Sequence, residues 1–534
     1  MPRVSRKHEI VAWTLPVGLE AVMTDSRPVK SSETGFPPVR AVELFAVAIS
    51  VLISDLTIFR GNGYFGLAVM FLALPILLAL GSPQRNARPS LWVMAVLLAG
   101  VVARLAWCGS GWAVLVGFVC LVGYAMALVG LPPYMTRVLG FASHLIASGH
   151  RGLNQYVVQF MANNRWIPRK SQFLSIGFPL LALLVFGSLF VLANPDLVKV
   201  VGTQFEQLVN QMLGWLKNIS LLEIPFCIAT GWLVIGLLRP TYQEPDEWGP
   251  APQSEALGPA PLFEAFRNTL VMVVGLFAAY LVFEFRTLWF REFPVGFHYS
   301  GYAHQGAAWL TVALGLATVL LSVIFQGQIL NDPRLGRLKT LAWVWSAENF
   351  VLAIAVMHRL SIYVDFNGMT RMRMVGWLGI ASVVVGFLLV VIKIAKGRDF
   401  RWLLRRELWT VSFAAYLYFI LPVDRWITQY NVRQILAGHL APSVQISEHP
   451  LSTEGYLELL PLLKCQDEII RRGITAMLFE RKAALSRDEL RTSDWTARQI
   501  AEDQLDKQLL SIPEPLYNHT ADFEAFQKYA YQWY

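Results

Sequence analysis

The stretch LAVMFLALPILLAL, residues 67–80, decides the fold class of this chain. It runs for fourteen residues without a charged side chain, and LWVMAVLLAGVVA (91–103) and VVVGFLLVVI (383–392) are similarly apolar. About 20 such residues in a helix cross a hydrocarbon core of roughly 30 Å. Of the 534 residues, 55% are hydrophobic and only 15% are charged. These features predict an all-α, polytopic integral membrane protein.

Eleven apolar runs are long enough to be membrane spans. They are residues 41–59, 64–80, 91–108, 112–131, 172–193, 219–238, 263–283, 306–325, 342–359, 374–392 and 407–421. Asp55 and Glu223 interrupt the first and the sixth run, and the last run is short. We therefore expect about 11 transmembrane helices.

These runs and the segments between them divide the chain into five parts. The parts are a cytoplasmic N-terminal segment (1–40), a first membrane helix group of six spans (41–238), a Pro-rich cytoplasmic linker (239–262), a second membrane helix group of five spans (263–421) and a small C-terminal helical domain (422–534). Within the first group, residues 132–171 combine basic and spaced apolar positions, which favours a pair of amphipathic helices in the membrane interface. No sequence repeat relates the two groups, so an inverted-repeat transporter gains no support.

Lysine and arginine residues set the expected orientation. With a cytoplasmic N-terminus, the predicted cytoplasmic segments hold 24 of them, and the opposite side without the C-terminal domain holds 8. An odd number of spans then places that domain outside the cytoplasm. The domain is mildly acidic, with 16 acidic against 12 basic residues, and its apolar residues have helical spacing. Its last twelve residues, FEAFQKYAYQWY, contain six aromatic side chains that either pack on the domain itself or rest at the membrane interface.

The sequence contains no recognised catalytic or cofactor motif. It has no H-E-x-x-H, C-x-x-C, G-x-S-x-G or Walker pattern, so no catalytic residue, cofactor or metal is predicted. His298, His304 and a carboxylate are residue types that bind metals, but nothing in their spacing fixes ligand geometry. No basic stripe with interleaved aromatics is present, so a nucleic-acid partner is not expected. The expected partner is the lipid bilayer.

Charged residues within the apolar runs need partners, water or an interface, because a charge in hydrocarbon is costly. Glu43, Asp55 and Arg286 lie near the ends of runs and are expected to snorkel. Glu348 lies well inside the ninth run. Arg359 returns to nearly the same helical face eleven residues later, but about 16 Å along the axis, so these two cannot pair. Arg104, or a residue at the outer ends of neighbouring helices, would serve as partner for Glu348, and a structural ion pair and a functional site both stay open.

Three polar stretches fall on the predicted outer side: residues 283–306, the segment RLSIYVDFNGMTRMR (359–373) and LPVDRWITQYNVR (421–433). They and the ninth run supply the candidate polar cluster or ligand-binding residues: Glu284, Tyr299, Tyr302, His304, Glu348, Arg359, Tyr363, Asp365, Arg371, Arg373, Tyr430 and Asn431. Asn-Gly is turn chemistry, so a plain connector remains an alternative for residues 359–373. The arginines in this segment lie where the positive-inside bias disfavours them, which suggests that they pair with acids or hold an anionic ligand such as a lipid phosphate.

These stretches also carry a family resemblance. YSGYAHQG (299–306), RLSIYVDFNGMTRMR and LPVDRWITQYNV, in this order after apolar runs, resemble bacterial polytopic membrane proteins known only as domain of unknown function 4173, with a close relative 4153. His304 stands where members of that family often carry an arginine. The resemblance implies a multi-pass protein of the bacterial cytoplasmic (inner) membrane, and it implies no reaction, cofactor or substrate.

Three classes of function fit these observations. A non-catalytic sensor, scaffold or envelope-assembly factor would use the acidic C-terminal domain to contact a protein partner. A transporter or channel for a small or anionic solute would be lined by residues such as Arg104, Glu223 and Glu348. An enzyme acting on a lipid-linked substrate would need Asp365, Glu284 or a histidine as base, with Arg371 or Arg373 holding phosphate. The absence of a catalytic motif favours the first class.

Overall fold

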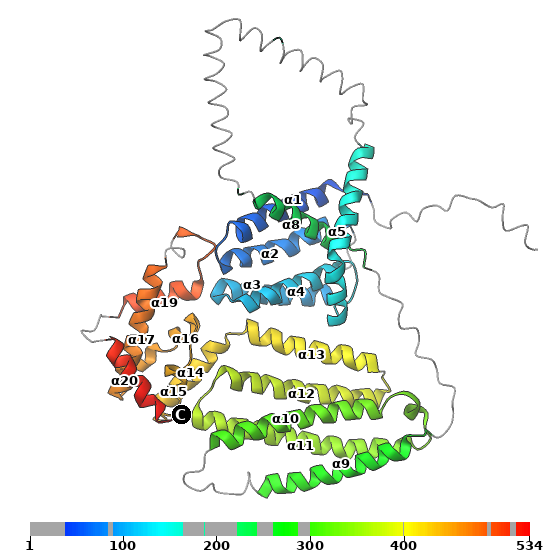
Figure 1. Cartoon of the computed structure of the whole chain (residues 1–534), viewed down its shortest axis with the longest axis vertical. Coiled ribbons are helices and arrows are strands. Elements are labelled where there is room, and N and C mark those ends of the chain that lie inside the picture. The colour runs from blue at the N-terminus through cyan, green and yellow to red at the C-terminus, as the bar shows by residue number, and fades with distance from the viewer. Residues whose placement is uncertain are drawn as a thin grey trace, which may run out of the picture.

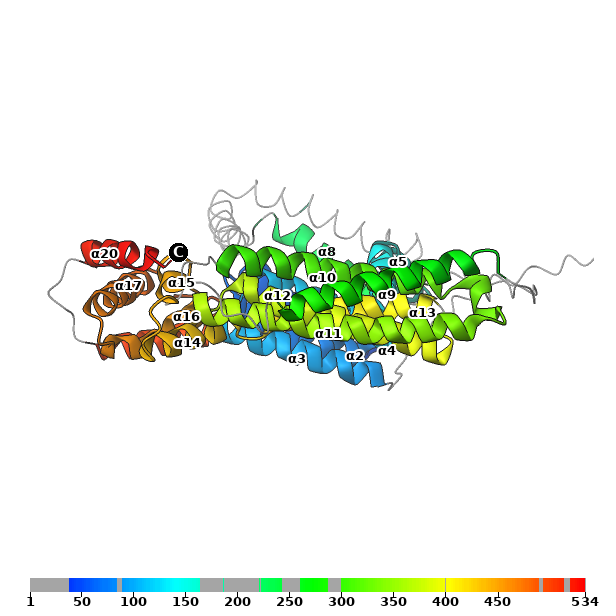
Figure 2. The same cartoon turned by 90° about the horizontal axis from the view of Figure 1, so that it is seen from below.

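A computed structural model describes residues 38–83, 89–163, 186, 220, 222–242, 260–286, 299–398, 400–488, 493–512 and 519–533. Over these residues the regular structure is helical, and no strand occurs. Figure 1 shows two groups of helices lying roughly side by side, with the C-terminal helices gathered at one end of them, and Figure 2 shows the same arrangement after a quarter turn. We call residues 423–533 the tail.

The first group begins with α1 (Ala41–Ser54), which continues through one π-helical turn, Asp55–Phe59. The other helices of this group are α2 (Tyr64–Gly81), α3 (Pro89–Cys108), α4 (Gly111–Leu128), α5 (Met135–Asn163) and α8 (Glu223–Leu238). α5 runs across the other helices at the end away from the tail (Figure 1). The sequence favours a pair of amphipathic helices over residues 132–171. In the described part of this region, α5 is instead one amphipathic helix.

The second group of helices has the polar stretches of the sequence near the end that faces the tail. It contains α9 (Phe263–Glu284), α10 (Tyr299–Ile324), the short 3₁₀ helix Gly327–Asn331, α11 (Leu335–Asn367), α12 (Arg371–Lys396) and α13 (Phe400–Ile420). α13 joins the two groups: the Tyr416 hydroxyl donates to the Leu97 carbonyl at 2.9 Å, and Phe419 stacks on Trp112.

Seven helices in the described part of the chain are long and apolar enough to cross a membrane. They are Ala41–Phe59, Tyr64–Gly81, Pro89–Cys108, Gly111–Leu128, Phe263–Glu284, Leu335–Asn367 and Arg371–Lys396. Glu223–Leu238 and Trp309–Ile324 are shorter apolar helices. Apart from residue 186, the predicted run 172–193 lies outside the described residues, as do most of residues 1–40 and of the linker. The expectation of an all-helical chain with several membrane-crossing helices is confirmed, whereas the count of eleven is not.

Two acids that the sequence places near the membrane surface are instead buried and paired. Both carboxylate oxygens of Glu43 accept from Arg239, at 2.6 and 2.9 Å, and one accepts from the Tyr156 hydroxyl at 2.6 Å. Asp55 lies 3.2 Å from Arg60. Snorkelling is therefore the wrong explanation for Glu43, whose partners come from other helices. Asp55 is also buried, but its partner Arg60 ends the same helical segment and is about half-exposed.

The tail packs around its own apolar core. Its helices are α14 (Val423–Leu436), α15 (Ser443–Ser447), α16 (Thr453–Leu457), a 3₁₀ turn (Leu460–Lys464), α17 (Glu468–Arg487), α19 (Ile500–Leu510) and α20 (His519–Tyr531). Phe526 of the aromatic C-terminal segment is fully buried beside Gly473 of α17, and the Tyr529 hydroxyl donates to Asp467 at 2.8 Å. Of the two alternatives for this segment, packing on the tail or resting at the membrane interface, the structure shows packing on the tail.

Candidate functional site

The segment RLSIYVDFNGMTRMR forms the end of α11, a tight turn and the start of α12, at the end of the bundle that the tail covers. Gly368 ends α11 with a φ of 84°, a conformation that favours glycine. Thr370 then caps α12, because its side chain accepts from the Arg373 amide at 3.3 Å. The Asn-Gly pair thus makes the predicted turn.

Side chains of the tail hold this turn by hydrogen bonds to its backbone. Asn431 of α14 accepts from the Met369 amide at 2.6 Å and donates to the Met369 carbonyl at 2.9 Å. Gln445 of α15 donates to the Asn367 carbonyl at 3.0 Å. Asn431 is fully buried, so these bonds are shielded from water. The turn is part of a fixed junction between membrane helices and tail.

Arg359, the first residue of the segment, makes a structural ion pair. Its guanidinium donates to both carboxylate oxygens of Glu284 on α9, at 2.6 and 2.5 Å, and Tyr280 also donates to Glu284. Arg359 and Glu284 are 3% and 1% exposed. The pair therefore links α9 to α11 inside the bundle. Removing either partner would leave a buried charge without its counter-ion.

Arg371 and Tyr430 connect α11 and α12 to α14. Arg371 donates to both oxygens of Asp424, each at 2.6 Å, and the Tyr430 hydroxyl donates to Asp365 at 2.7 Å. Burial alone would raise the pKa of Asp424, but hydrogen bonds from Arg371 and Ser452 and the positive charges of Arg371 and Arg104 together hold the pKa below its usual value. Burial, followed by the bond to Asp365, raises the pKa of Tyr430 to about 12.

Arg373 has a different environment. Its side chain is 8% exposed, donates to the Gly368 carbonyl and lies with its guanidinium carbon 3.9 Å from the centre of the Tyr363 ring. No carboxylate pairs with it in the part of the chain that the structure describes. A guanidinium has five N–H donors, so this buried cation keeps donors for another partner.

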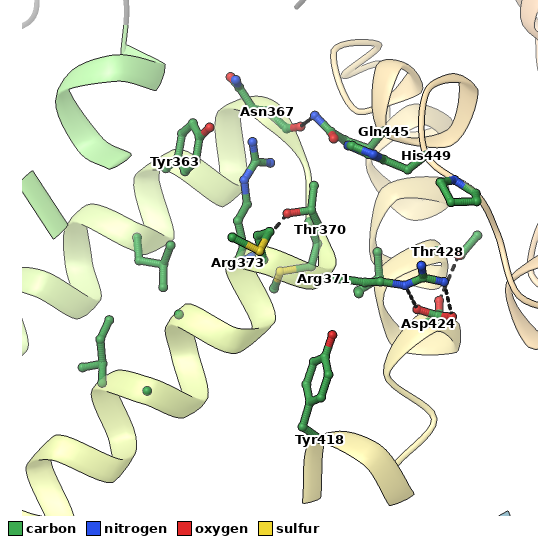
Figure 3. Close-up of a pocket in the computed structure, with 18 of the residues that line it drawn as sticks. Tyr363, Asn367, Thr370, Arg371, Arg373, Tyr418, Asp424, Thr428, Gln445 and His449 are labelled. Carbon is green, nitrogen blue, oxygen red and sulfur yellow. Dashed lines mark hydrogen bonds and ion pairs between the residues drawn. The ribbon is translucent and has the colours of Figure 1, made fainter. Parts of the chain in front are cut away.

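A cavity of about 840 Å³ opens beside this turn, between α10, α11, α12 and the tail. Its polar wall includes Asn367, Thr370, Arg371, Arg373, Tyr418, Asp424, Thr428, Gln445 and His449. Figure 3 shows Arg371 reaching toward Asp424, while Arg373 extends from the start of α12 toward the Asn367 turn and Tyr363. Counting the two arginines and Asp424, the wall carries one net positive charge, which favours an anionic ligand.

The structure divides the predicted site residues into several places. Tyr363, Arg371 and Arg373 line the cavity, and Asp365, Tyr430 and Asn431 support its walls. Arg359 and Glu284 form their own pair inside the bundle. Glu348 lies in mid-α11, and its buried Oε2 has no hydrogen-bond partner within the described ranges. Tyr299, Tyr302 and His304 belong to the start of α10, but their side chains lie outside the described residues, as does His298.

The prediction that Arg104 pairs with Glu348 is wrong. It donates instead to Glu454 of the tail at 2.7 Å, and Trp107 donates to the same oxygen at 3.2 Å. Glu454 is fully buried. Sequence reasoning missed Glu454 because it lies 350 positions from Arg104 along the chain. Its segment has no apolar run that would mark it as a neighbour of α3.

Asp424, Gln445, His449 and Trp533 also line the cavity and were not singled out from sequence. Asp424 lies in the quoted LPVDRWITQYNVR stretch, so an acid opposite the surplus arginines was available as a signal. Gln445 comes from the five-residue helix α15, His449 from the loop after it and Trp533 from the chain end, where spacing gives no indication. Among the described residues, no group of three or more His, Cys, Asp or Glu could hold a metal ion.

Comparison with known proteins places the chain in a family. Residues 44–462 match the domain of unknown function DUF4153, which covers most of the chain. The chain belongs to this family. The matched range includes both helix groups and the part of the tail that holds the turn, so the cavity lies within the DUF4153 region apart from Trp533. Of the two related families suggested by the motifs, 4153 is thus shown and 4173 is not confirmed. No curated protein and no solved structure matches the chain.

Proposed function

We propose that this chain is a non-catalytic membrane sensor or scaffold that binds a small anionic ligand in the cavity between α12 and the tail. In this proposal it resides in a bacterial inner membrane, with its N-terminus in the cytoplasm and its tail outside. The observation that carries the proposal is the wall of the cavity, where a half-exposed Arg371 and a buried Arg373 flank the start of α12. The positive end of a helix dipole adds to the attraction for an anion.

The same contacts support a sensing role. Arg371 is bound to Asp424 on α14, so an anion that takes hydrogen bonds from Arg371 competes with a contact between membrane helices and tail. Asn431 on the same helix holds the turn between α11 and α12. Ligand binding would thus change how α14 is held. A protein partner that contacts the tail would receive this change.

The contacts of the acids favour binding over catalysis. Asp424 is the carboxylate of the cavity wall, and both of its oxygens are bound by Arg371. A general base needs a free oxygen within reach of the proton that it removes. Of the bases that the enzyme hypothesis names, Asp365 accepts from Tyr430, and both oxygens of Glu284 accept from Arg359.

Binding of inorganic phosphate to the purified full-length chain tests the proposal by titration calorimetry. We expect saturable binding that weakens about tenfold in Arg371→Gln, since a charge-assisted hydrogen bond contributes about 1.5–3 kcal/mol. Arg425→Gln is the matched control: Arg425 lies on α14, is similarly exposed and pairs with Glu458 at 2.7 Å. Equal binding by both variants, or no binding of phosphate or glycerol 3-phosphate, would overturn the proposal. Labelling of a cysteine introduced on the tail surface, in intact cells, tests the orientation.

A transporter is the second candidate, and a specific observation supports it. Glu348 on α11 and Glu407 on α13 each have a buried carboxylate oxygen without a hydrogen-bond partner in the described chain. A carboxyl group in such a place is best tolerated in its protonated form, as found in proton-coupled transporters. Flux of phosphate or protons into proteoliposomes that is lost in Glu348→Gln would favour this candidate, and unaltered flux would count heavily against it.

A further inference from the structure

The cavity has an apolar part that the binding of a small anion does not use. Along α12, Met372, Gly376, Gly379 and Ile380 follow one another on one face at helical spacing, and all four line the cavity. Leu360 of α11 and Val312 of α10 face them across it. From Arg371 to Ile380 this wall extends about 13 Å along the helix axis. The cavity therefore continues from a charged end into an apolar slot.

Two glycines keep this slot open. A Cβ atom at Gly379 would have no described atom within 4 Å, and one at Gly376 would meet only Leu360, at 3.3 Å or more. Small residues in membrane helices usually allow a neighbouring helix to approach closely. At Gly379 no described neighbour uses that opportunity. The missing side chains leave room along α12 for something other than a helix.

The depth of the slot matches the way a lipid lies in a bilayer. α12 is one of the helices able to cross the membrane, so its first turn lies near the interface and residues 376–380 lie at hydrocarbon depth. The charged end of the cavity is then at the level of lipid head groups. The apolar end is at the level of acyl chains.

The charged end also offers the donors that a lipid phosphate accepts. Thr370 satisfies the amides of Arg373 and Met374, whereas the amides of Arg371 and Met372 have no acceptor in the part of the chain described here. Arg373 adds a buried guanidinium that pairs with no carboxylate among the described residues. These groups lie beside one another at the start of α12.

We infer that the ligand is an anionic amphiphile, a lipid phosphate whose head group binds at the start of α12 and whose acyl chain lies in the slot along Gly376 and Gly379. This inference rests on the proposed anion binding and adds the acyl chain to it. A free phosphate would fill only the charged end. A lipid phosphate fills both ends.

The test compares probes that differ only in chain length. Glycerol 3-phosphate, butanoyl- and hexanoyl-lysophosphatidate, each below its micelle concentration, are titrated into the full-length chain in nanodiscs. Affinity is expected to rise at least about tenfold from glycerol 3-phosphate to the hexanoyl probe, because each buried methylene group adds about 0.8 kcal/mol. Gly379→Leu should abolish this gain and leave glycerol 3-phosphate binding unchanged. Gly275→Leu is the control, since Gly275 also faces open space in a membrane helix but does not line the cavity.

Each outcome decides between the two proposals. If glycerol 3-phosphate binds but the acyl chain of the longer probes adds no affinity, the lipid inference is overturned and anion binding stays intact. If no probe binds, both proposals are overturned. Photocrosslinking of the wild-type chain gives an answer even where Gly379→Leu fails to fold. A lysophosphatidate with a photoreactive group on its chain should label the peptide that contains residues 372–380. Labelling spread equally over all membrane helices would contradict the inference.

Discussion

The tail meets the two helix groups in two different ways. Against the first group the contact is closed: the amides of Phe65 and Gly66 donate to the Thr496 carbonyl, and a Cβ atom at Gly63 would lie 2.3 Å from the Ala497 Cα. The Arg104–Glu454 pair is buried beside these contacts. Against the second group the contact surrounds a cavity, and the Arg371–Asp424 pair is 46% and 17% exposed.

This difference separates an anchor from a binding site. A buried ion pair with backbone contacts has no room for a ligand, and separating it would expose charges that water does not reach. A half-exposed pair at a cavity can exchange one anionic partner for another at little cost. Attachment to the first group should therefore persist while attachment to the second group responds to ligand.

The largest effect is expected from removing the anchor. Glu454→Ala removes the carboxylate that pairs with the nearly buried Arg104, whose side chain is 11% exposed, so we expect a loss of about 3–5 kcal/mol in the free energy of unfolding. Chemical denaturation in detergent, followed by tryptophan fluorescence, measures this loss. Glu458→Ala is the control: its Arg425 pair is partly exposed, and its loss should stay below about 1 kcal/mol. Equal losses in both variants would remove the distinction between the two interfaces.

The next largest effect concerns the clamp on the turn. Asn431→Ala removes both hydrogen bonds to Met369 and leaves buried backbone groups without partners, which should cost about 1–3 kcal/mol. Asn431→Asp keeps the bond from the amide and loses the one to the carbonyl, so an intermediate loss is expected. Hydrogen exchange at residues 367–371 reports the release of the turn directly. Unchanged exchange there in Asn431→Ala would contradict the clamp.

The membrane helices were predictable from sequence because burial in lipid imposes a signal on every residue of a span. The runs 64–80 and 91–108 correspond to α2 and α3 within two residues at each end. The Asn-Gly turn was predictable for a local reason, since few residues tolerate the conformation of Gly368. Residues 172–193 remain a prediction.

The partners of the charged residues were not predictable in the same way. Arg359 was expected to need an acid, but nothing local to it pointed to Glu284 at 75 positions away. Arg104 was offered to Glu348 because both lie in apolar runs, whereas its partner Glu454 belongs to the polar tail. Pairing depends on which helices lie side by side, and a single sequence does not encode that order in any short pattern. The cavity, built from five separate segments, was out of reach for the same reason.

A smaller effect on stability is expected from the exposed pair. Arg371→Gln should change the free energy of unfolding by less than about 1 kcal/mol, because water already screens much of the attraction between Arg371 and Asp424. Phosphate affinity should nevertheless fall, as proposed above. The comparison with Glu454→Ala is informative: one variant loses stability and retains binding, and the other does the reverse. A loss of several kcal/mol in Arg371→Gln would make the second interface an anchor as well.

The smallest effect is a dependence on pH. The Asp424 carboxylate has a pKa below its usual value: burial acts to raise it, but the hydrogen bonds from Arg371 and Ser452 and the positive charges of Arg371 and Arg104 together outweigh burial. A carboxyl whose pKa is lower in the folded state stabilises that state above its unfolded pKa of about 4, and this contribution is lost as pH falls through the folded value. Acid should therefore loosen the second interface, which exposes peptides of α14 to hydrogen exchange. Asp424→Asn carries no such titration, so its exchange in α14 should change less between pH 6 and pH 3 than that of the wild-type chain. An equal change in both would assign the acid sensitivity to other groups and leave Arg371–Asp424 without a role in attaching the tail.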